Sequence, residues 1–470
     1  MTQIGTSSHP LRVAIIGSGP SGFYAADRLQ KEAGLVVEID MFDRLPTPFG
    51  LVRGGVAPDH AKIKSVTKVY DKIAAAPGFR FLGNVSFGRD VTLDDVRPRY
   101  HAIIYAVGAQ TDRRMGIPGE DLPGSHPATE FVGWYNGHPD YRDFQFDLSQ
   151  ERVAIVGNGN VAMDVARILA KTPEELSQTD IADYALAALR HSKVREIYIL
   201  GRRGPAQAAF TNPEIKELGE LADADVVVEP SEMVLDDASA AMLANATDRT
   251  AQRNIDILNA YSQREPSGRT RRIRLRFCVS PIALSGDGCV ERVTLVRNIL
   301  VAGKDGSVKA QATDETETLP VGLVFRSIGY KGVALPGVPF DEQRGVIPNA
   351  EGRVVDADGA VLPGQYVVGW IKRGPSGIIG TNKPDSVETA ERLIEDWRAG
   401  RLAELPGSGD IADLLTARAV TVVSYADWQT LDALEVASGA EQGRPRLKFT
   451  SVSQMLDALR EAKLRTTSAG

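Results

Sequence analysis

The chain contains the sequence VAIIGSGPSG at residues 13–22 and a second copy of the same pattern, VAIVGNGNVA, at residues 153–162. In each copy an apolar run typical of a buried strand precedes glycines at G-x-G-x-x-G/A spacing, and a helix-compatible stretch follows them. The first glycine permits a tight strand-to-helix turn, the second lets a pyrophosphate approach the backbone, and the third small residue lets the helix pack on the strand. Two copies in this context predict two dinucleotide sites, and such a chain usually moves electrons between two dinucleotides.

The fingerprint residues themselves are the predicted contacts to the two pyrophosphates, because backbone N–H groups and the positive end of a helix dipole attract phosphate. The first fingerprint consists of Gly17, Ser18, Gly19, Pro20, Ser21 and Gly22. The second consists of Gly157, Asn158, Gly159, Asn160 and Val161, with Ala162 as the third small residue.

The two copies differ at the end of the next strand. After the first, the apolar run at residues 36–42 ends at Asp43, and a carboxylate there can accept hydrogen bonds from both hydroxyls of an adenosine ribose. After the second, the run at residues 197–200 ends in Gly201, Arg202 and Arg203. Two guanidinium groups suit a 2′-phosphate, although such arginines can also be solvated loop charges. The contrast predicts FAD or NAD at the first site and NADPH at the second.

Composition agrees with an enzyme of more than one domain. With 470 residues, 43% hydrophobic and 24% charged, the chain is too long for one core. The net charge of −7 gives no sign of nucleic-acid binding, and no apolar run is long enough to span a membrane. The residues before the first strand are few and polar, so a cytoplasmic location is expected.

Cysteine content separates this chain from flavoenzymes that reduce disulfides. Only Cys278 and Cys289 are present, eleven positions apart around a predicted turn, and neither lies in a CxxC motif. There is no cysteine cluster for an iron–sulfur centre, and no metal site is expected. Electrons that enter from a nicotinamide must therefore leave directly from a flavin.

The order of strand and helix patterns predicts an α/β fold with two Rossmann-like domains, in a glutathione-reductase-like layout without a redox disulfide. An FAD-binding domain is expected at residues 1–112 and 332–470, with an NADPH-binding domain inserted at 113–331. Further expected elements are strands at 226–228, 273–279, 323–329 and 366–370, a helix-prone stretch at 236–264, a helix at 378–397, and two helices around the turn at 443–446.

Several segments carry a resemblance to a known family. They are LPTPFGLVRGGVAPDH at residues 45–60, FVGWYN at 131–136, residues 157–167, GRRGP at 201–205, GWIKRGPSG at 369–377, and Trp428, Leu431, Asp432, Glu435, Pro445 and Arg446. Through them the chain resembles adrenodoxin-reductase-like NADPH:ferredoxin reductases of the actinobacterial type. The resemblance implies an FAD enzyme that takes hydride from NADPH and passes single electrons to an acidic iron–sulfur ferredoxin, which feeds an acceptor such as a cytochrome P450. A monomer or weak dimer is expected.

The resemblance also assigns roles near the flavin. Leu51 and Val85 line the FAD region, although on composition alone they are equally well core aliphatics. Trp370 and the backbone of Gly377, Ile378 and Ile379 form the flavin-ring site, where a helix N-terminus would direct N–H groups at the ring. Asp43 stands where close relatives tend to carry Glu on the FAD ribose.

Other implied roles lie near the nicotinamide. Arg113 contacts NADP, and Glu214 lies near the carboxamide or is only a first-turn acid favoured by the helix dipole. His60 and Asp164 are the candidates nearest to the chemistry. Hydride transfer to a flavin needs no general base, but a His–carboxylate pair could position the nicotinamide and manage a proton. A single His is more often a structural hydrogen-bonding residue, so both readings stay open.

The acceptor is less defined by sequence. An electron-input subunit of a larger flavoenzyme and a general NADPH diaphorase or quinone reductase are alternatives. Two basic stripes are candidates for ferredoxin docking: Arg272, Arg274 and Arg276 on one face of a strand, and Lys64, Lys68 and Lys72 at helical spacing. The arginine stripe fits equally well a charged edge strand that discourages aggregation.

Overall fold

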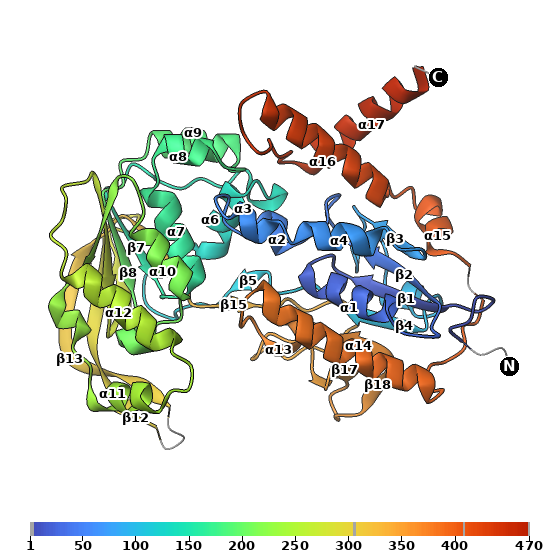
Figure 1. The fold of residues 1–470 in the computed structure, drawn as a ribbon, viewed down its shortest axis with the longest axis horizontal. Helices are drawn as coiled ribbons and strands as arrows, with labels where there is room; N and C mark the ends of the chain where they lie inside the picture. Colours follow the sequence, from blue (N-terminus) through green and yellow to red (C-terminus); the bar gives the residue numbers. More distant parts are fainter. Residues whose placement is uncertain (1–3, 304–306, 408, 469–470) are drawn as a thin grey trace. The chain divides into compact units, whose positions relative to one another are not determined.

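The computed structural model describes residues 4–303, 307–407 and 409–468 (Figure 1). The chain divides into two compact units. The first comprises Met1–Val56, His60–Thr111 and Tyr330–Gly470, and the second comprises Ala57–Asp59 and Asp112–Gly329. Each unit has its own sheet, with one glycine fingerprint after a central strand. The two Rossmann-like folds predicted from the fingerprints are therefore confirmed.

The first unit is built on a seven-stranded sheet of order β16-β17-β18-β4-β1-β2-β3. These strands are Asn349–Ala350, Arg353–Val355, Val361–Val367, Ala102–Tyr105, Leu11–Ile16, Val37–Phe42 and Phe79–Leu82. The pairs from β18 to β3 are parallel, and β16 and β17 add an antiparallel edge. Strand β1 lies inside the sheet, between β4 and β2, and the turn that follows it opens at the carboxyl edge of the sheet, where ligands of doubly wound folds bind.

Helices cover both faces of this sheet. They are α1 (Pro20–Gln30), α2 (Leu51–Gly54), α3 (Ala61–Lys64), α4 (Thr67–Ala74), α5 (Leu93–Val96), α13 (Trp370–Arg373), α14 (Asn382–Arg398), α15 (Ile411–Ala417), α16 (Tyr425–Ala440) and α17 (Val452–Ser468). Figure 1 shows α1 and α14 packed side by side. Phe23 of α1 stacks on Tyr70 of α4, with ring centroids 4.8 Å apart. This aromatic packing fixes the helix that follows the first fingerprint.

Three expectations for the first unit need correction. The strand expected at 366–370 ends at Val367, and Trp370 begins α13. A left-handed φ of 75° at Gly369 turns the chain from strand to helix. After Gly400 there are three helices rather than two, because α15 precedes the pair around the turn. Lys64 ends α3 while Lys68 and Lys72 belong to α4, so the lysines do not lie on one continuous helix.

The second unit has a six-stranded sheet of order β6-β14-β7-β8-β10-β9, in which every pair is parallel. These strands are Ser125–Pro127, Leu323–Arg326, Arg152–Val156, Glu196–Leu200, Arg271–Arg276 and Ala224–Val228. An antiparallel sheet, β11-β12-β13, follows at Val279–Ser285, Arg292–Ala302 and Val308–Pro320. The short strands β5 (Thr111–Asp112) and β15 (Tyr330–Lys331) pair with each other.

The helices of the second unit are α6 (Ala128–Tyr135), α7 (Asn160–Ala170), α8 (Pro173–Ser177), α9 (Asp183–Arg190), α10 (Asn212–Leu218), α11 (Asp237–Asn245) and α12 (Thr250–Ser262). One core cluster joins the six-stranded sheet to α6, α7, α9, α10 and α12. A second cluster joins its other face to the three-stranded sheet through Val156, Leu200, Val279 and Leu295. The sheet is thus covered on both faces, as a parallel sheet requires.

The run expected as one strand at 273–279 belongs to two sheets. Strand β10 ends at Arg276, and β11 begins at Val279. The corner lies at Cys278, whose φ is 53°, in the left-handed region that side chains rarely adopt. The turn expected between Cys278 and Cys289 lies only at its far end: β11 follows Cys278, and the chain turns back after Ser285, beside Cys289. Seven extended residues span roughly 23 Å, far beyond the reach of a disulfide. No helix among the described residues is long and apolar enough to cross a membrane.

Candidate functional site

The first fingerprint joins β1 to α1, and its glycines serve different purposes. Gly17 has a φ of 107°, and a Cβ there would lie 2.6 Å from the carbonyl oxygen of Ala106. A Cβ on Gly22 would lie 2.5 Å from the carbonyl oxygen of Gly17. At Gly19, in contrast, no atom lies within 4 Å of the Cβ position. The fold itself therefore requires the first and third glycines, whereas the second leaves an open cradle that a side chain would fill.

The start of α1 is suited to an anion. Pro20 occupies the first turn, and no side chain of the described residues caps this end of the helix. The N–H groups at the end of a helix need acceptors, and a phosphate group supplies them. The open space at Gly19 lies at this same end. The cradle can therefore hold a pyrophosphate.

Asp43 lies at the carboxyl end of β2, beside the same loop. Its carboxylate accepts hydrogen bonds from the Ser18 N–H at 3.2 Å, from Ser18 Oγ at 2.5 Å and from the Leu45 N–H at 2.9 Å. Burial raises the pKa of Asp43, and these hydrogen bonds act against that rise. The acid is therefore tied to the fingerprint loop through Ser18.

A second loop, within residues 45–60, reaches the cradle. The Phe49 N–H donates to the Ser18 carbonyl at 2.9 Å, and a Cβ on Gly50 would lie 3.0 Å from Cα of Gly19. Leu51 follows at the start of α2 with 39% of its surface exposed. Val85, in contrast, is buried in the sheet core, and its N–H donates to the Asp43 carbonyl. Leu51 is thus open to a ligand, and Val85 supports Asp43 from within the core.

The C-terminal helices hold that loop in place. The buried Glu435 of α16 accepts hydrogen bonds from Arg53 at 2.5 and 2.9 Å, and the guanidinium of Arg53 lies 5.1 Å from the Trp428 ring centroid. Trp428 also meets Phe49 edge-on. Residues 49–53 and α16, far apart in sequence, therefore form one support behind the first cradle.

The expected flavin-ring segment lies beside the first fingerprint. Ser21 Oγ donates to Asn382 Oδ1 at 3.2 Å, and Gly369 packs against Ser21. Trp370 stacks on Tyr330, with centroids 5.3 Å apart. Gly377 adopts a φ of 82°, Ile378 is exposed, and Ile379 begins the 3-10 turn Ile379–Thr381 that leads into α14. A helix start therefore lies at this place, although its first residues form a 3-10 turn rather than α14 itself.

The second fingerprint repeats the geometry of the first. Gly157 has a φ of 120°, and a Cβ there would collide with the Ser327 carbonyl oxygen, whereas Gly159 has open space around its Cβ position. Asn158 packs its side-chain amide against Gly201, and Asn160 Oδ1 accepts the Thr211 N–H at 2.8 Å. Val161 packs into the core below. The second cradle is therefore also open at its middle glycine.

Arg202 and Arg203 follow β8 directly, at the carboxyl end of the sheet. Arg202 is exposed and Arg203 is half-buried, and no described carboxylate forms an ion pair with either. Burial, together with the charge of Arg202, lowers the pKa of Arg203. Two cations without an acidic partner lower their energy by binding a dianion. Arg113 is exposed as well, and its N–H donates to the Gly329 carbonyl at 2.9 Å.

Sequence reasoning missed the hub that connects Asp164 with Glu214. Arg167, only 2% exposed, donates to Asp59 at 2.7 and 3.1 Å, to Asp164 at 2.6 Å and to Glu214 at 3.0 Å. Although burial acts against its charge, these carboxylates raise the pKa of Arg167 well above its ordinary value. The signal that could have revealed the hub is an arginine three positions after an aspartate within the otherwise apolar run that follows the second fingerprint.

His60 follows Asp59 directly in the chain and precedes the short helix α3, without capping it through its side chain. It belongs to the first unit, while Asp164 belongs to the second. The expected pairing of His60 with Asp164 stays a prediction.

The arginine stripe lies in the second unit on β10. Arg272, Arg274 and Arg276 point to one face, because the residues between them are buried. The reading as an edge strand is wrong, since β10 lies between β8 and β9. Arg272 and Arg274 pair with Glu196, and Arg276 pairs with Glu232 and Glu317. These glutamates neutralise most of the charge that the stripe was expected to offer a ferredoxin.

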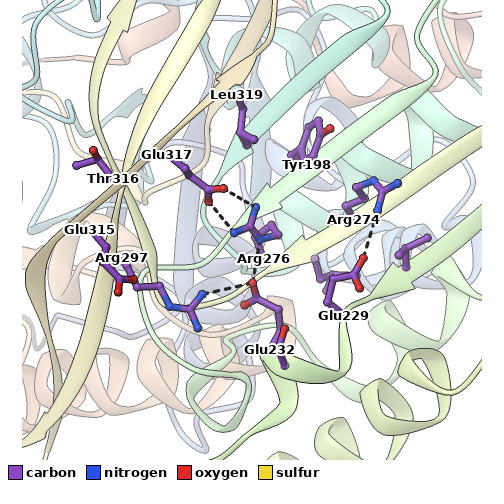
Figure 2. A pocket seen from close by; sticks show the side chains of 13 residues that line it. Tyr198, Glu229, Glu232, Arg274, Arg276, Arg297, Glu315, Thr316, Glu317 and Leu319 are labelled. Atoms are coloured by element: carbon purple, nitrogen blue, oxygen red, sulfur yellow. Dashed lines mark hydrogen bonds and ion pairs between the residues drawn. The ribbon is translucent and has the colours of Figure 1, made fainter.

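A pocket of about 690 Å³ opens over this face, between β10 and the long strand β13 (Figure 2). Glu232 lines it, with Arg276 and Arg297 directed toward its carboxylate, and Glu317 meets Arg276 from the other side. The charged side chains thus bind one another, and the residues that line the pocket do not include those of the second glycine fingerprint.

The fold and the two cradles define the class of the protein: a two-dinucleotide oxidoreductase without a redox disulfide. Residues 11–199 match the family model for pyridine nucleotide-disulphide oxidoreductase. The chain is 49% identical over 459 residues to the NADPH-ferredoxin reductase FprA of Mycobacterium tuberculosis, covering 95% of this chain and 98% of that protein. It is 42% identical to the human mitochondrial NADPH:adrenodoxin oxidoreductase, covering 95% and 92%.

Among solved structures, Mycobacterium tuberculosis FprA in complex with NADPH superposes with a TM-score of 0.90 at 48% identity, covering 96% of this chain and all of that chain. The chain belongs to the family of adrenodoxin-reductase-like NADPH-ferredoxin reductases. The resemblance read from the sequence segments is therefore confirmed.

Proposed function

We propose that this protein is an FAD-dependent NADPH:ferredoxin oxidoreductase, with FAD in the first unit and NADPH in the second. One observation carries the assignment. Each unit has an open glycine cradle, but the neighbouring strand ends in a carboxylate, Asp43, in the first and in two arginines, Arg202 and Arg203, in the second, for which no acidic partner lies among the described residues. A carboxylate suits the ribose hydroxyls of FAD, and paired guanidiniums suit the 2′-phosphate that distinguishes NADPH from NADH.

In the first unit, residues 17–22 would hold the FAD pyrophosphate and Asp43 the ribose. Leu51 would contact the cofactor directly, while Val85 would act only as a support beneath Asp43. Trp370 and the backbone of residues 377–379 would hold the flavin ring, where the start of the 3-10 turn directs N–H groups outward. Bound FAD supplies the chemistry of the reaction, since it accepts a hydride and releases electrons one at a time.

In the second unit, residues 157–161 would hold the pyrophosphate of NADPH, Arg202 and Arg203 the 2′-phosphate, and Arg113 a further part of the nicotinamide nucleotide. Glu214 and Asp164 both bind Arg167. Because a buried cation holds both acids, we assign them to orienting the nicotinamide rather than to abstracting a proton. His60 is the side chain proposed to manage a proton near the flavin.

The acceptor that we propose is an acidic iron–sulfur ferredoxin, which in turn supplies a terminal acceptor such as a cytochrome P450. NADPH delivers two electrons, so each turnover would reduce two one-electron ferredoxins. The FprA and adrenodoxin reductase relatives carry this activity in their names. A cytoplasmic location and a monomer or weak dimer stay predictions of the sequence.

The cofactor assignment is tested with the double variant R202A/R203A. We expect kcat/KM for NADPH to fall by about 10- to 100-fold per arginine, because one charge-assisted contact contributes about 1.5–3 kcal/mol. The value for NADH should stay within about twofold. The variant R190A/R195A removes the same charge from exposed arginines of the same unit and serves as control. An unchanged NADPH-to-NADH preference in R202A/R203A would contradict the proposal.

The acceptor is tested separately. The purified yellow protein is assayed with NADPH against acidic ferredoxins and against ferricyanide, at rising ionic strength. Ferredoxin reduction should weaken with salt, because the attraction between opposite charges is screened, while ferricyanide reduction should change far less. A protein that reduces ferricyanide and quinones but none of the ferredoxins would instead be a general diaphorase.

A further inference from the structure

The loop that carries Arg202 and Arg203 is held from behind by its backbone. The Val279 N–H donates to the Gly201 carbonyl at 3.0 Å, and the Cys278 N–H donates to the Arg203 carbonyl at 3.0 Å. Asn298 Nδ2 donates to the carbonyl between them, that of Arg202, at 2.9 Å. Three successive carbonyls of the loop are therefore bound by the start of β11 and by one side chain of β12.

Asn298 is placed for this contact by a bulge. The pairing of β12 with β13 shifts register between Val296 and Asn298. A bulge re-aims the side chain beside it, and here the Asn298 amide is buried and reaches the carbonyl of Arg202. The amide also donates to Ser280 Oγ at 2.8 Å, and the Asn298 N–H donates to the Cys278 carbonyl at 2.7 Å. Asn298 thus binds both the corner at Cys278 and the arginine loop.

The corner at Cys278 is strained, and its neighbours compensate. A non-glycine residue with a φ of 53° costs about 1–3 kcal/mol and persists only where the surroundings hold it. Directly before it, the Phe277 N–H donates to Glu232 at 2.7 Å, and the Arg276 guanidinium donates to the same carboxylate at 2.9 Å. Figure 2 shows Arg276 and Arg297 both directed toward Glu232, one of the residues that line the pocket. The carboxylate of Glu232 therefore fixes the two residues that precede the corner, Arg276 and Phe277.

We propose that Asn298 and the left-handed corner at Cys278 are positioning residues for coenzyme choice, which hold the backbone of Arg202 and Arg203 in the geometry that binds a 2′-phosphate. The proposal rests on the proposed function of the two arginines. Two like charges on one loop repel each other, so a free loop would spread them apart. Fixing the backbone in advance removes that reorganisation from the binding step. Neither residue contacts the phosphate in this role.

The test measures ligand binding as well as turnover. Calorimetry compares 2′,5′-ADP with 5′-AMP, which lacks the 2′-phosphate, for the wild type, N298A and R202A/R203A. For N298A we expect affinity for 2′,5′-ADP to fall by about 5- to 10-fold, the effect of one buried hydrogen bond, with 5′-AMP affinity unchanged. KM for NADPH should rise by the same factor, while kcat and the NADH kinetics stay constant.

Asn136 provides a matched control, because it is an equally buried asparagine of the same unit that donates to a carbonyl within α6. N136A should shift both ligand affinities together or neither.

Two variants of Cys278 test the corner itself. C278G keeps the N–H and accepts the left-handed φ, so it should preserve the ratio of the affinity for 2′,5′-ADP to that for 5′-AMP. C278V has a branched side chain that disfavours this φ, so it should lower the ratio.

The outcomes separate the two proposals. If R202A/R203A loses the preference for 2′,5′-ADP but N298A and C278V stay within twofold of the wild type, the positioning role is wrong and the proposed coenzyme site stands. If R202A/R203A keeps the preference, both are wrong. Loss of the preference in C278G would also overturn the backbone role, because that variant retains the donor.

Discussion

The two glycine cradles have the same backbone geometry and opposite electrostatics. In both, the first glycine is required by a left-handed φ and a close carbonyl, and the middle glycine leaves open space. At the first, the nearby carboxylate of Asp43 is bound by the loop itself; at the second, Arg202 and Arg203 have no acidic partner in the described chain. Glycines therefore define where a dinucleotide fits, and the residue at the next strand end defines which one.

The helices behind the cradles differ as well. Both helices pack apolar side chains into the core of their own unit, but α1 adds the stacking of Phe23 on Tyr70, whereas α7 carries Arg167, the centre of a buried ionic hub. Trimming apolar contacts lowers stability in small steps, whereas removing the central cation of a buried ion cluster is strongly destabilising, even with Lys171 still 3.6 Å from Asp59.

The largest effect is expected for R167M. This variant leaves the carboxylates of Asp59, Asp164 and Glu214 buried around an apolar side chain. The free energy of unfolding should fall by about 3–5 kcal/mol, measured by urea denaturation of the holoenzyme. The apolar counterpart F23L should cost only about 1–2 kcal/mol. Equal losses in the two variants would show that the helices are held in the same way.

A comparison within the first fingerprint comes next. G17A places a Cβ 2.6 Å from the Ala106 carbonyl oxygen at a left-handed φ, so it should lower the free energy of unfolding by roughly 2–4 kcal/mol. G19A enters open space and should leave the apoprotein about as stable as the wild type, but it should retain much less FAD. Thermal melts of the apoprotein and the flavin absorbance after gel filtration measure the two effects. FAD retention at the wild-type level in G19A would contradict the cradle.

The two units should also respond oppositely to mild acid. In the first, burial and the nearby His9 lower the pKa of His101 to about 4, and its Nδ1 accepts the Arg12 N–H at 2.9 Å. In the second, burial raises the pKa of Asp112 to about 6, against the hydrogen bond from Thr129. The contribution of His101 to the free energy of unfolding is fully present above pH about 6.5 and is lost as the pH falls toward 4. The contribution of Asp112 is fully present below pH about 4 and is lost as the pH rises through 6.

Each contribution amounts to about 2–3 kcal/mol, so single variants should change the slope of stability against pH in opposite directions. H101N keeps an acceptor for Arg12 and should flatten the loss of stability toward acid. D112N keeps an acceptor for Thr129. It should steepen the loss of stability toward acid, because the stabilisation that protonated Asp112 provides at low pH is removed. Urea denaturation at half-unit steps between pH 4 and 7 measures both. If the free energy of unfolding of H101N and of D112N varied with pH in the same way, the predicted opposite effects of His101 and Asp112 would be refuted.

The smallest effect is expected when both thiols are removed. Burial raises the pKa of Cys278 to about 11, so its thiol is unreactive at neutral pH, and Cys289 lies beyond the other end of β11. The variant C278G/C289S keeps the backbone corner and should retain ferredoxin reduction within about twofold of the wild type. Its stability should change by less than about 1 kcal/mol. A large loss of turnover would indicate a thiol in the electron path.

Local patterns were enough to predict the strands before both fingerprints, the helices after them and the acidic or basic end of the following strand. These features depend on short-range rules: glycine spacing, apolar runs and the residue that directly follows a strand. The same rules failed at Cys278, where one apolar run crosses between two sheets, and at Trp370, where Gly369 ends the strand early. Both are corners, and their direction depends on which sheet offers the next partner.

By itself the sequence determined the two cradles, their opposite charges and the family. Only the tertiary structure decided how distant residues act on them. Arg167 gathers Asp59, Asp164 and Glu214, and Glu435 of a C-terminal helix holds Arg53 beside the first loop. Asn298, from a bulge almost a hundred positions further on, binds the Arg202 carbonyl. Such contacts are set by packing between elements, and no periodicity or spacing along the chain encodes which partners will meet.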